Sequence, residues 1–228
     1  MENTFFITGT DTEVGKTYVS NLLLSYFKSE GYSTKAMKPI ASGCEILNGQ
    51  LKNEDALILQ KSATKNLIYN EVNPFAFEPA IAPHIAANVI NFNLSKEKVR
   101  DKINQFLKID SDISLIEGAG GWHLPLNQNE LLSELIGELN IPVILVVGMK
   151  LGALNHAILT ANAIINSGCK LAGWVSNIMN PKMPYLKENI IFLEERFNAL
   201  GIPCLAKISL NQKQLKLNKS ALFNGCFS

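Results

Sequence analysis

The segment from residue 9 to residue 17, Gly-Thr-Asp-Thr-Glu-Val-Gly-Lys-Thr, constrains the fold of this chain more than any other segment. It follows a short apolar run at residues 4–7 and precedes an amphipathic stretch at residues 18–27. A loop between a strand and a helix that ends in Gly-Lys-Thr is typical of a P-loop, in which backbone N–H groups and a helix N-terminus bind phosphate. In such a loop Lys16 contacts the β- and γ-phosphates, and the Thr17 hydroxyl binds Mg²⁺. The sequence therefore predicts a nucleoside triphosphate site near the start of the chain.

The spacing of this loop departs from the usual P-loop pattern. Counting back from Gly15, the position of the usual first glycine holds Thr10, and the glycine lies one residue earlier, at Gly9. The loop is therefore a variant, and we expect its additional residues to face a substrate as well as a nucleotide.

The charge and composition of the chain exclude several classes of partner. In 228 residues there are 21 basic and 20 acidic side chains, which leaves no basic surface of the kind that binds nucleic acid or an anionic membrane. The longest apolar run, residues 141–147, contains Pro142 and is far shorter than a membrane span. There is no signal-peptide pattern at the N-terminus, and the four cysteines form no C-x-x-C pair. We expect a cytoplasmic protein with free thiols and with neither nucleic acid nor membrane as a partner.

Apolar strand-like runs alternate with helix-like segments along the whole chain, and no linker or repeat divides it. This pattern predicts an α/β fold: one three-layer domain, residues 1–228, with a parallel sheet covered by helices on both faces. The predicted strands are residues 4–8, 34–38, 113–117, 143–147, 171–176 and 204–208. The predicted helices are residues 16–30, 54–61, 96–108, 130–139, 156–167 and 186–200, with Ser95 and Asn155 as N-caps. The proline-bearing stretch at residues 71–93 is predicted to be an ordered excursion near the site.

Polar residues and glycines follow the carboxyl ends of the predicted strands. In an open parallel sheet this edge is where ligands bind. The segments that follow the first five strands there are residues 9–17, 38–42, 117–121, 148–152 and Asn177. Their convergence predicts one binding site at this edge.

Three charged residues outside the P-loop are candidates for chemistry. Glu117 ends an apolar strand where P-loop proteins place a carboxylate that holds Mg²⁺, although such a carboxylate could instead cap the next turn. Asp55 could be a second metal ligand, or it could stabilise the start of a helix. Lys38 could project over the γ-phosphate, or it could be a solvated lysine at the end of a strand.

Several strings of residues, in order from about residue 4 to residue 180, resemble the dethiobiotin synthetase family. Besides the P-loop, the strings are Lys38-Pro39-Ile40-Ala41-Ser42-Gly43, Glu54-Asp55-Ala56-Leu57, Val72-Asn73-Pro74, Pro83-His84, Glu117-Gly118-Ala119-Gly120-Gly121-Trp122, Leu151-Gly152-Ala153-Leu154-Asn155-His156-Ala157 and Ala172-Gly173-Trp174-Val175-Ser176-Asn177. The resemblance implies a P-loop NTPase-like, homodimeric ligase that depends on ATP and Mg²⁺. Such an enzyme joins CO₂ to 7,8-diaminononanoate through a carbamate and a phospho-carbamate, closes the cyclic urea of dethiobiotin, and releases ADP and phosphate.

The resemblance also implies roles for individual residues. Lys16 and Lys38 would be catalytic, and Thr17, Asp55 and Glu117 would bind Mg²⁺. The nucleotide would contact Glu13, Val14, Gly15, Lys16, Thr17, Tyr18, Asp55, Glu117, Gly118, Ala119, Gly120 and Asn177, the last at the adenine. The second substrate would contact Thr12 and Ser42, and its carboxylate would be held across the dimer interface by Leu151, Gly152, Ala153 and Asn155. The family commonly has a proline where this chain has Ser209, so the resemblance leaves the remaining nucleobase contacts and the tail at residues 211–228 unassigned.

Two other functions are compatible with a P-loop in such a sheet. One is an ATPase switch of the chromosome-partitioning or metallochaperone kind, but these proteins usually have a second lysine inside the loop, where this chain has residues 10–12, Thr-Asp-Thr. The other is a catalytically inactive dimeric binding protein, which the filled charged positions disfavour. A guanine-specific module is disfavoured because the chain has no Asn-Lys-x-Asp segment.

Overall fold

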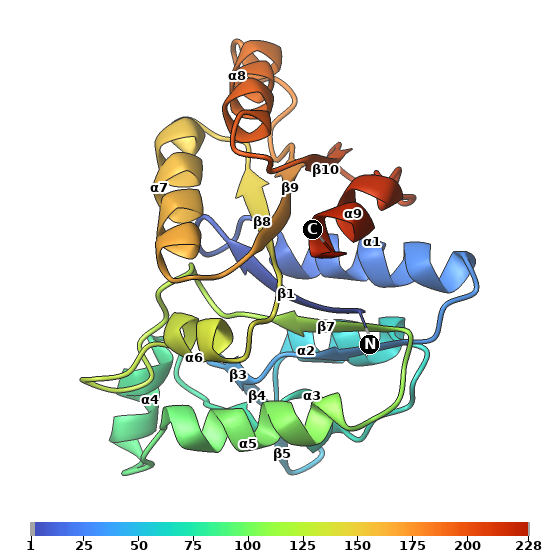
Figure 1. Cartoon of the computed structure of the whole chain (residues 1–228). Coiled ribbons are helices and arrows are strands. Elements are labelled where there is room, and N and C mark those ends of the chain that lie inside the picture. The colour runs from blue at the N-terminus through green and yellow to red at the C-terminus, as the bar shows by residue number, and fades with distance from the viewer. Residues whose placement is uncertain (1–2, 228) are drawn as a thin grey trace.

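A central parallel sheet organises the protein (Figure 1). The computed structural model describes residues 3–227, and the predicted domain of residues 1–228 extends beyond them by residues 1, 2 and 228. The six strands of the sheet lie in the order β10-β9-β8-β1-β7-β2. Their bounds are β1 (Asn3–Gly9), β2 (Thr34–Met37), β7 (Ile113–Glu117), β8 (Val143–Gly148), β9 (Leu171–Asn177) and β10 (Cys204–Ile208). All six predicted strands are therefore confirmed, with ends that differ by a residue or so.

Helices cover both faces of this sheet, as the alternation of segments predicts. Their bounds are α1 (Lys16–Ser29), α2 (Glu54–Ser62), α3 (Tyr69–Val72), α4 (Pro83–Val89), α5 (Lys96–Leu107), α6 (Leu132–Glu138), α7 (Ala153–Asn166), α8 (Leu186–Asn198) and α9 (Lys219–Phe227). Successive side chains of a strand point to opposite faces. Accordingly, Phe5 and Ile7 of β1 pack in one buried cluster with Val19 of α1, whereas Phe6 packs in a second cluster with Ile103 of α5. The three-layer α/β/α fold class is confirmed.

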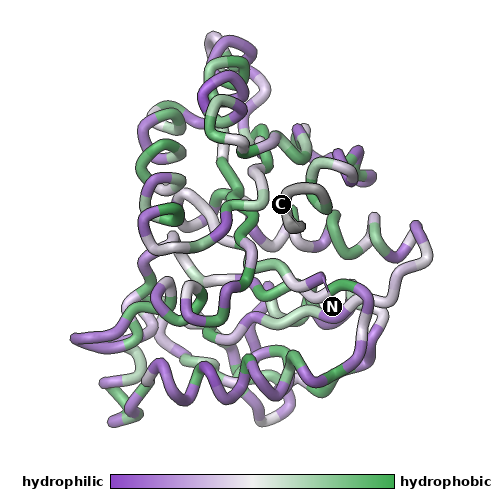
Figure 2. Tube along the Cα trace, in the orientation of Figure 1, coloured by the Kyte–Doolittle hydropathy of each residue, from purple (hydrophilic) through white to green (hydrophobic). Residues whose placement is uncertain are grey.

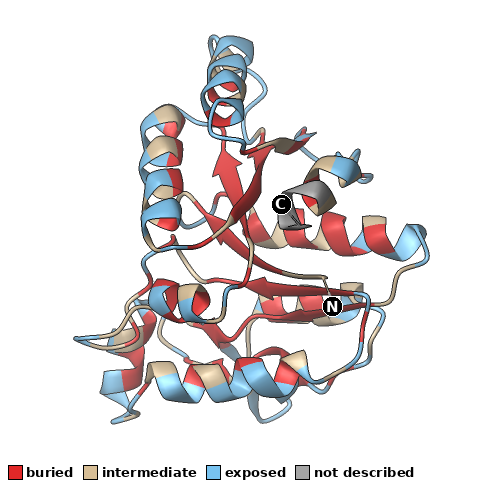
Figure 3. Cartoon of the chain, viewed as in Figure 1, coloured by how far each residue is buried: buried red, intermediate tan, exposed pale blue. Residues whose placement is uncertain are grey.

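The distribution of apolar residues follows these layers. The strands of the central sheet are almost wholly buried, and most of the exposed residues lie on the outer sides of the helices, in the connecting loops and in the short strand β4 (Figure 3). The hydropathy of the chain has the same pattern, with hydrophilic residues along the outer helices (Figure 2). Within residues 3–227 we find no helix with the length and apolar character that crossing a membrane requires.

The structure differs from the sequence prediction mainly in short elements. The helix predicted from residue 156 begins at Ala153, because Gly152 adopts a left-handed conformation (φ 88°) and is the N-cap. The predicted N-cap at Asn155 is therefore wrong, whereas Ser95 does cap α5, its side chain accepting from the Lys98 N–H. The stretch at residues 71–93 is ordered by the pairing of β6 with β3 and by α4. The short strands are β3 (Ile40–Ala41), β4 (Glu45–Leu47), β5 (Gln50–Lys52) and β6 (Phe75–Ala76).

Candidate active site

A cavity of about 520 Å³ opens at the carboxyl ends of β1, β2 and β7. Four chain segments line it: the P-loop with the start of α1, the segment after β2, the start of α2, and the loop after β7. The lining residues are Thr12, Glu13, Gly15, Lys16, Thr17, Tyr18, Asn21, Lys38, Ala41, Ser42, Asn53, Glu54, Asp55, Ile58, Ala119 and Gly120. The structure thus brings together Lys38 and most of the candidate residues for the nucleotide, but only Thr12 and Ser42 of those for the second substrate.

The P-loop is held against the sheet by Asn177 at the end of β9. The Asn177 side chain donates from Nδ2 to the backbone oxygen of Val14, at 2.8 Å. Gly15 follows with φ +87°, and a Cβ atom at this position would lie 2.3 Å from the same Nδ2 atom. Only glycine fits here, because another residue would suffer both the backbone strain and the collision. Asn177 therefore acts on the loop itself, from a position behind the cavity lining.

Lys16 is a buried cation at the entrance of α1. Its Nζ donates to the backbone oxygen of Asp11 at 3.1 Å, and only 7% of the residue is exposed. Burial, helped by the positive charge of Lys38, lowers the pKa of Lys16 from 10.5 to about 8. Asp11 in turn forms an ion pair with Lys150 at 3.0 Å, which joins the P-loop to the turn after β8. Among the described residues, no carboxylate lies at hydrogen-bond distance from the positive charge of Lys16.

We expect Lys16→Met to stabilise the nucleotide-free protein at pH 7. The folded-state pKa of Lys16 lies below its unfolded value, so charging this lysine opposes folding below about pH 8, and the penalty fades as the pH rises toward 10.5. At about 1.4 kcal/mol per pKa unit, the penalty at pH 7 is about 3 kcal/mol. Urea unfolding of both proteins at several pH values measures it, and the advantage of the variant should shrink above pH 8.

The control for this prediction is Lys61→Met, because Lys61 is exposed on α2 and lies outside the cavity lining. This variant should leave the free energy of unfolding nearly unchanged at every pH. A Lys16→Met protein that is less stable than the wild type at pH 7 would contradict the prediction.

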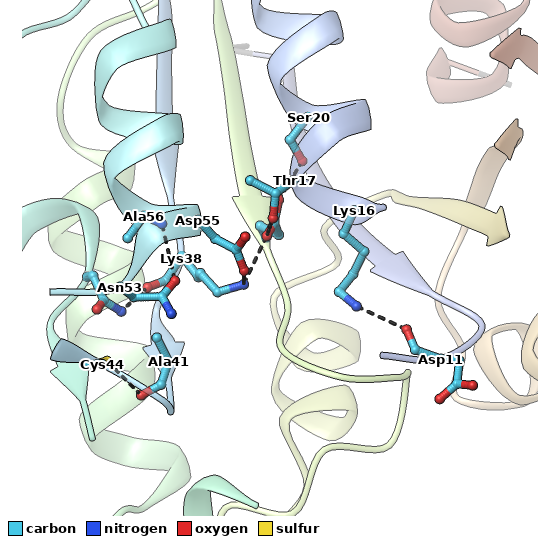
Figure 4. A network of polar contacts seen from close by, with 12 residues as sticks. Asp11, Lys16, Thr17, Ser20, Lys38, Ala41, Cys44, Asn53, Asp55 and Ala56 are labelled. Atoms are coloured by element: carbon cyan, nitrogen blue, oxygen red, sulfur yellow. Dashed lines mark hydrogen bonds and ion pairs between the residues drawn. The ribbon is translucent and has the colours of Figure 1, made fainter. Parts of the chain in front are cut away.

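Glu117, at the end of β7, is the acceptor in a buried polar network. Its donors, Thr17, Ser20 and Lys38, are labelled in Figure 4. Its Oε1 accepts from the Thr17 hydroxyl at 2.7 Å and from the Lys38 Nζ at 2.9 Å. Its Oε2 accepts from the Ser20 hydroxyl at 2.7 Å. The carboxylate is fully buried, so these donors replace the water that it loses on folding. Its partners are on α1 and in the segment after β2, so Glu117 does not merely cap the turn that follows β7.

Lys38 is a second buried cation, and it bridges two carboxylates. Its Nζ lies 3.0 Å from Asp55 Oδ2 and 2.9 Å from Glu117 Oε1, and the lysine side chain is 6% exposed. Burial alone would lower the pKa of Lys38, but the two carboxylates outweigh burial and hold the pKa above its usual value. Lys38 is therefore a buried cation, paired with two carboxylates in the wall of the cavity, and is not a solvated residue.

Asp55 lies at the first turn of α2 and faces Lys38 (Figure 4). The N-cap of this helix is Asn53, whose Oδ1 accepts from the Ala56 N–H at 3.3 Å. Burial would raise the pKa of Asp55, but Lys38 outweighs burial and lowers it below the usual value. The carboxylate is thus free of the capping role and ionised beside the cavity.

The remaining candidate residues lie outside the cavity lining. The side chain of Val14, within the P-loop, is fully buried, and Gly118 packs on the Phe6 ring, where a Cβ atom would lie 2.8 Å from Cζ. Leu151 lies in the turn between β8 and α7 and is 95% exposed. Gly152, Ala153 and Asn155 form the N-cap and first turn of α7. Within this single chain these last four residues do not meet the cavity.

Some residues of the site were missed in the sequence. Ser20 lies three residues after Thr17, so helical spacing places both hydroxyls on one face of α1, toward Glu117. Asn53 stands directly before Glu54-Asp55, which is an N-cap signal. The positions of Asn21, Glu54 and Ile58 in the cavity wall depend on how α1 and α2 pack, and no local pattern reveals them.

The segment after β10 lies against the P-loop side of the molecule. The Tyr18 hydroxyl donates to the backbone oxygen of Gln212, and the Gln212 side chain accepts from the Ser209 N–H at 3.0 Å. The first part of the tail, which the sequence left unassigned, is therefore attached to α1 beside the cavity.

Thr17 and Asp55 line the cavity and the fully buried Glu117 lies directly behind Thr17, and the chemistry of these three donors suits Mg²⁺. Magnesium prefers oxygen ligands, and in phosphate-binding sites one or two carboxylates usually hold it together with water and substrate phosphates. The Thr17 hydroxyl and the carboxylates of Asp55 and Glu117 are such ligands, and a single lysine Nζ now joins the two carboxylates. In the part of the chain that the structure describes, no group of three or more His, Cys, Asp or Glu side chains could hold a metal ion. The proposed set has two carboxylates and a hydroxyl.

Solved structures with similar folds confirm the fold class. The MinC:MinD cell division protein complex of Aquifex aeolicus contains a chain that matches 99% of this one and 86% of its own length, with a TM-score of 0.56 and 11% identity. The signal recognition particle 54 kDa protein of Aeropyrum pernix matches 99% of this chain over 46% of its own length, with a TM-score of 0.54 and 14% identity. At such identities the similarity establishes a P-loop NTPase-like fold.

Sequence comparisons identify the family. A family model described as an AAA domain matches residues 3–215. The ATP-dependent dethiobiotin synthetase BioD of Pseudomonas paraeruginosa is 49% identical over 204 residues, 90% of this chain and 88% of that protein. The protein of the same name from Cellvibrio japonicus is 48% identical over the same shares, and that of Aeromonas salmonicida is 46% identical over 83% of this chain and 84% of its own. With the predicted resemblance thus confirmed, this chain belongs to the family of ATP-dependent dethiobiotin synthetases, the ligases of biotin biosynthesis.

Proposed function

We propose that this cavity joins CO₂ to 7,8-diaminononanoate and closes the cyclic urea of dethiobiotin, with ATP converted to ADP and phosphate. The main observation behind the proposal is that two buried lysines lie in the wall of one cavity. Lys16 is on the P-loop, and Lys38 bridges Glu117 and Asp55. Phosphoryl transfer needs positioning and charge stabilisation more than it needs a protein nucleophile. A cavity with two cations and ionised carboxylates supplies both.

The reaction balances in three steps. One amine of the diamine adds to CO₂ and loses a proton, which gives a carbamate anion. The carbamate oxygen then attacks the γ-phosphorus of ATP, so that an O–P bond forms, the bond to ADP breaks, and a phospho-carbamate results. Finally the second amine attacks the carbamate carbon, expels phosphate and loses a proton, which closes the ring.

In this scheme the two lysines stabilise negative charge at different places, Lys16 at the phosphates of ATP and Lys38 at the carbamate and the transferring phosphoryl group. Lys16 lies on the P-loop and would leave the Asp11 carbonyl for the phosphates. Lys38 is already fixed by its two carboxylates, so its charge would meet the carbamate and the transferring phosphoryl group without reorganisation. A fixed donor of this kind is worth about 3–4 kcal/mol in the transition state.

The same scheme divides the other residues between the nucleotide, the metal and the second substrate. Backbone groups of residues 13–18 and 118–120 would bind the triphosphate, with Asn177 near the adenine. Thr17, Asp55 and Glu117 would hold Mg²⁺, which supplies charge neutralisation at the phosphates when it is bound. Thr12 and Ser42 both line the cavity, which supports contact with the diamine–carbamate end.

We also propose that the enzyme is a homodimer. It would act in the cytoplasm on small molecules, with neither a nucleic acid nor a membrane as a partner. The residues implied in binding the substrate carboxylate, Leu151, Gly152, Ala153 and Asn155, lie outside the cavity of their own chain. A second copy would bring them to the substrate, and the 95% exposure of the apolar Leu151 side chain supports such a contact.

The test of the function is release of phosphate from ATP by the purified protein in the presence of Mg²⁺, bicarbonate and 7,8-diaminononanoate. We expect release only when all components are present, with dethiobiotin identified by mass spectrometry. Phosphate release that does not depend on the diamine would instead indicate an ATPase switch and would refute the proposal.

The dimer is tested by Leu151→Glu, which places a charge on the proposed interface. We expect a shift toward monomer in analytical ultracentrifugation and a rise in KM for the diamine of roughly 10-fold, the loss expected for one hydrogen bond to a charged group. Ile46→Glu is the matched control, because Ile46 is 65% exposed on β4. An unchanged sedimentation coefficient for Leu151→Glu in a dimeric wild type would remove Leu151 from the interface.

A further inference from the structure

Two buried polar side chains beside the cavity have no part in the scheme above. Tyr69 begins α3 and Asn73 directly follows this helix, and the two residues are 8% and 2% exposed. The Tyr69 hydroxyl donates to Asn73 Oδ1 at 2.9 Å. Neither residue lines the cavity, although Asn73 lies in one of the strings that characterise the sequence.

Asn73 holds the backbone of Lys38. Its Nδ2 donates to the Lys38 carbonyl oxygen at 2.7 Å, and the Lys38 N–H donates to the carbonyl oxygen of Val72 at 2.8 Å. The pairing of β2 with β7 ends at Met37, so the sheet itself does not hold Lys38. The end of α3 therefore fixes both polar backbone groups of the lysine that bridges the two carboxylates.

Tyr69 holds the beginning of α2. Its hydroxyl oxygen accepts from the Asn53 N–H at 2.7 Å, and Asn53 is the N-cap of the helix whose first turn carries Asp55. The Lys52 Nζ lies 5.5 Å from the centroid of the Tyr69 ring, which further anchors this end of the chain segment. One hydroxyl and one amide thus connect the backbone of Lys38 to the backbone next to Asp55.

We propose that Tyr69 and Asn73 are positioning residues that set the separation of Lys38 and Asp55. The two segments they connect carry the side chains that meet in the ion pair of 3.0 Å. Buried polar groups are costly unless they are bonded, and a chain of bonds in which each buried group is satisfied specifies one arrangement. The series of hydrogen bonds from Asn53 through Tyr69 and Asn73 to Lys38 fixes one arrangement of Lys38 and Asp55 from behind the cavity wall.

The first test needs no activity and uses the full-length, nucleotide-free protein. Asn73→Ala, Tyr69→Phe and Lys38→Met are made singly, and each of the first two is combined with Lys38→Met for urea unfolding. For each double variant, we expect the change in the unfolding equilibrium constant to differ by at least about threefold from the product of the changes in its two single variants. This is the behaviour of residues that belong to one network. Tyr69→Phe keeps the ring and remains informative if Asn73→Ala does not fold.

The matched control is Thr64→Val. The Thr64 hydroxyl oxygen accepts from the Thr34 N–H at 2.7 Å, so this residue holds the opposite end of β2, away from the cavity. Its effect on the unfolding equilibrium constant should multiply with that of Lys38→Met. If the effects of Tyr69→Phe and Asn73→Ala on the unfolding equilibrium constant also multiply with that of Lys38→Met, the coupling is absent and the proposal is overturned.

The second test rests on the proposed function and measures the role in turnover. Tyr69→Phe should lower kcat for diamine-dependent phosphate release roughly 10-fold, as expected for a small misplacement of reacting groups, with KM for ATP within about twofold of wild type. In the Lys38→Met background the same change should lower kcat no further. An equal loss in both backgrounds would show that Tyr69 does not act through Lys38. A wild type without diamine-dependent release would refute the proposed function instead, and the unfolding test would still decide the positioning role.

Discussion

Lys38→Met is expected to lower kcat for diamine-dependent phosphate release by at least about 100-fold, the loss typical of one fixed donor to a developing oxyanion. Methionine keeps the length and most of the volume of the side chain, so the packing around the segment after β2 is retained. What it removes is the charge that bridges Asp55 and Glu117 at 3.0 and 2.9 Å. Steady-state kinetics with saturating ATP and diamine measures the effect.

Loss of the lysine should also weaken the fold, because it leaves the fully buried carboxylate of Glu117 with only hydroxyl donors. Circular dichroism and a urea titration therefore accompany the kinetics, so that turnover is compared under conditions where both proteins are folded. Lys61→Met, an exposed change on α2, should retain wild-type kcat. A folded Lys38→Met protein with near-normal turnover would exclude Lys38 from the mechanism.

Glu117→Gln is expected to have the second large effect, again a loss of kcat of at least about 100-fold. The substitution is nearly isosteric but removes the charge that Thr17, Ser20 and Lys38 now share. Breaking a buried ion pair in this way typically destabilises by about 3–5 kcal/mol, and Asp55 compensates only part of the Lys38 charge. The proposed Mg²⁺ set also loses one of its two carboxylates, so the Mg²⁺ concentration that gives half-maximal activity should rise.

The pH dependence of this variant distinguishes a charge effect from a packing effect. Burial lowers the pKa of Lys16 to about 8, and the Glu117 carboxylate is among the groups that raise it. Removing that carboxylate must therefore lower the pKa of Lys16 further, so the residual activity should decline at a lower pH than in the wild type. Ser20→Ala is the control, because it removes one donor to the same carboxylate and keeps its charge. It should cost only a few-fold in kcat, as for one neutral hydrogen bond, and leave the position of the basic limb unchanged.

The sheet and the principal helices could be predicted because their signals are local. Buried parallel strands are continuous apolar runs, as in residues 143–147, and helices such as α5 have a polar cap and a regular apolar stripe. The short strands β3 and β6 have no such signal, because they pair with each other across a long stretch of chain. By contrast, β4 and β5 form a local hairpin about Asn48-Gly49, a turn signal that was missed in the sequence. The error at Asn155 has a similar cause: Gly152 can begin the helix in a left-handed conformation, and a cap rule for Asn does not reveal this.

For the site, as for the fold, the residues placed by a local pattern were predictable, and the contacts between distant segments were not. The P-loop and the acidic residue after β7 occupy positions that the strand–loop–helix pattern determines, so Thr17 and Glu117 could be paired before their distance was known. The contact of Lys38 with Asp55 joins residues from separate segments, and the sequence did not predict it. The family resemblance implied a catalytic role for Lys38 and Mg²⁺ binding for Asp55, but no contact between them. The roles of Tyr69 and Asn73 were not predictable, since each hydrogen bond from Asn73 to Lys38 or from Asn53 to Tyr69 depends on the folding of an irregular segment.

The buried charge of Lys16 has a consequence for the lifetime of the protein in the cell. Burial lowers the pKa of Lys16, so its charge opposes folding, and a triphosphate at the P-loop would supply a counter-charge. A ligand that binds only the folded state stabilises it in proportion to the logarithm of its concentration. Degradation by proteases that attack unfolded chains should therefore be slower when nucleotide is abundant.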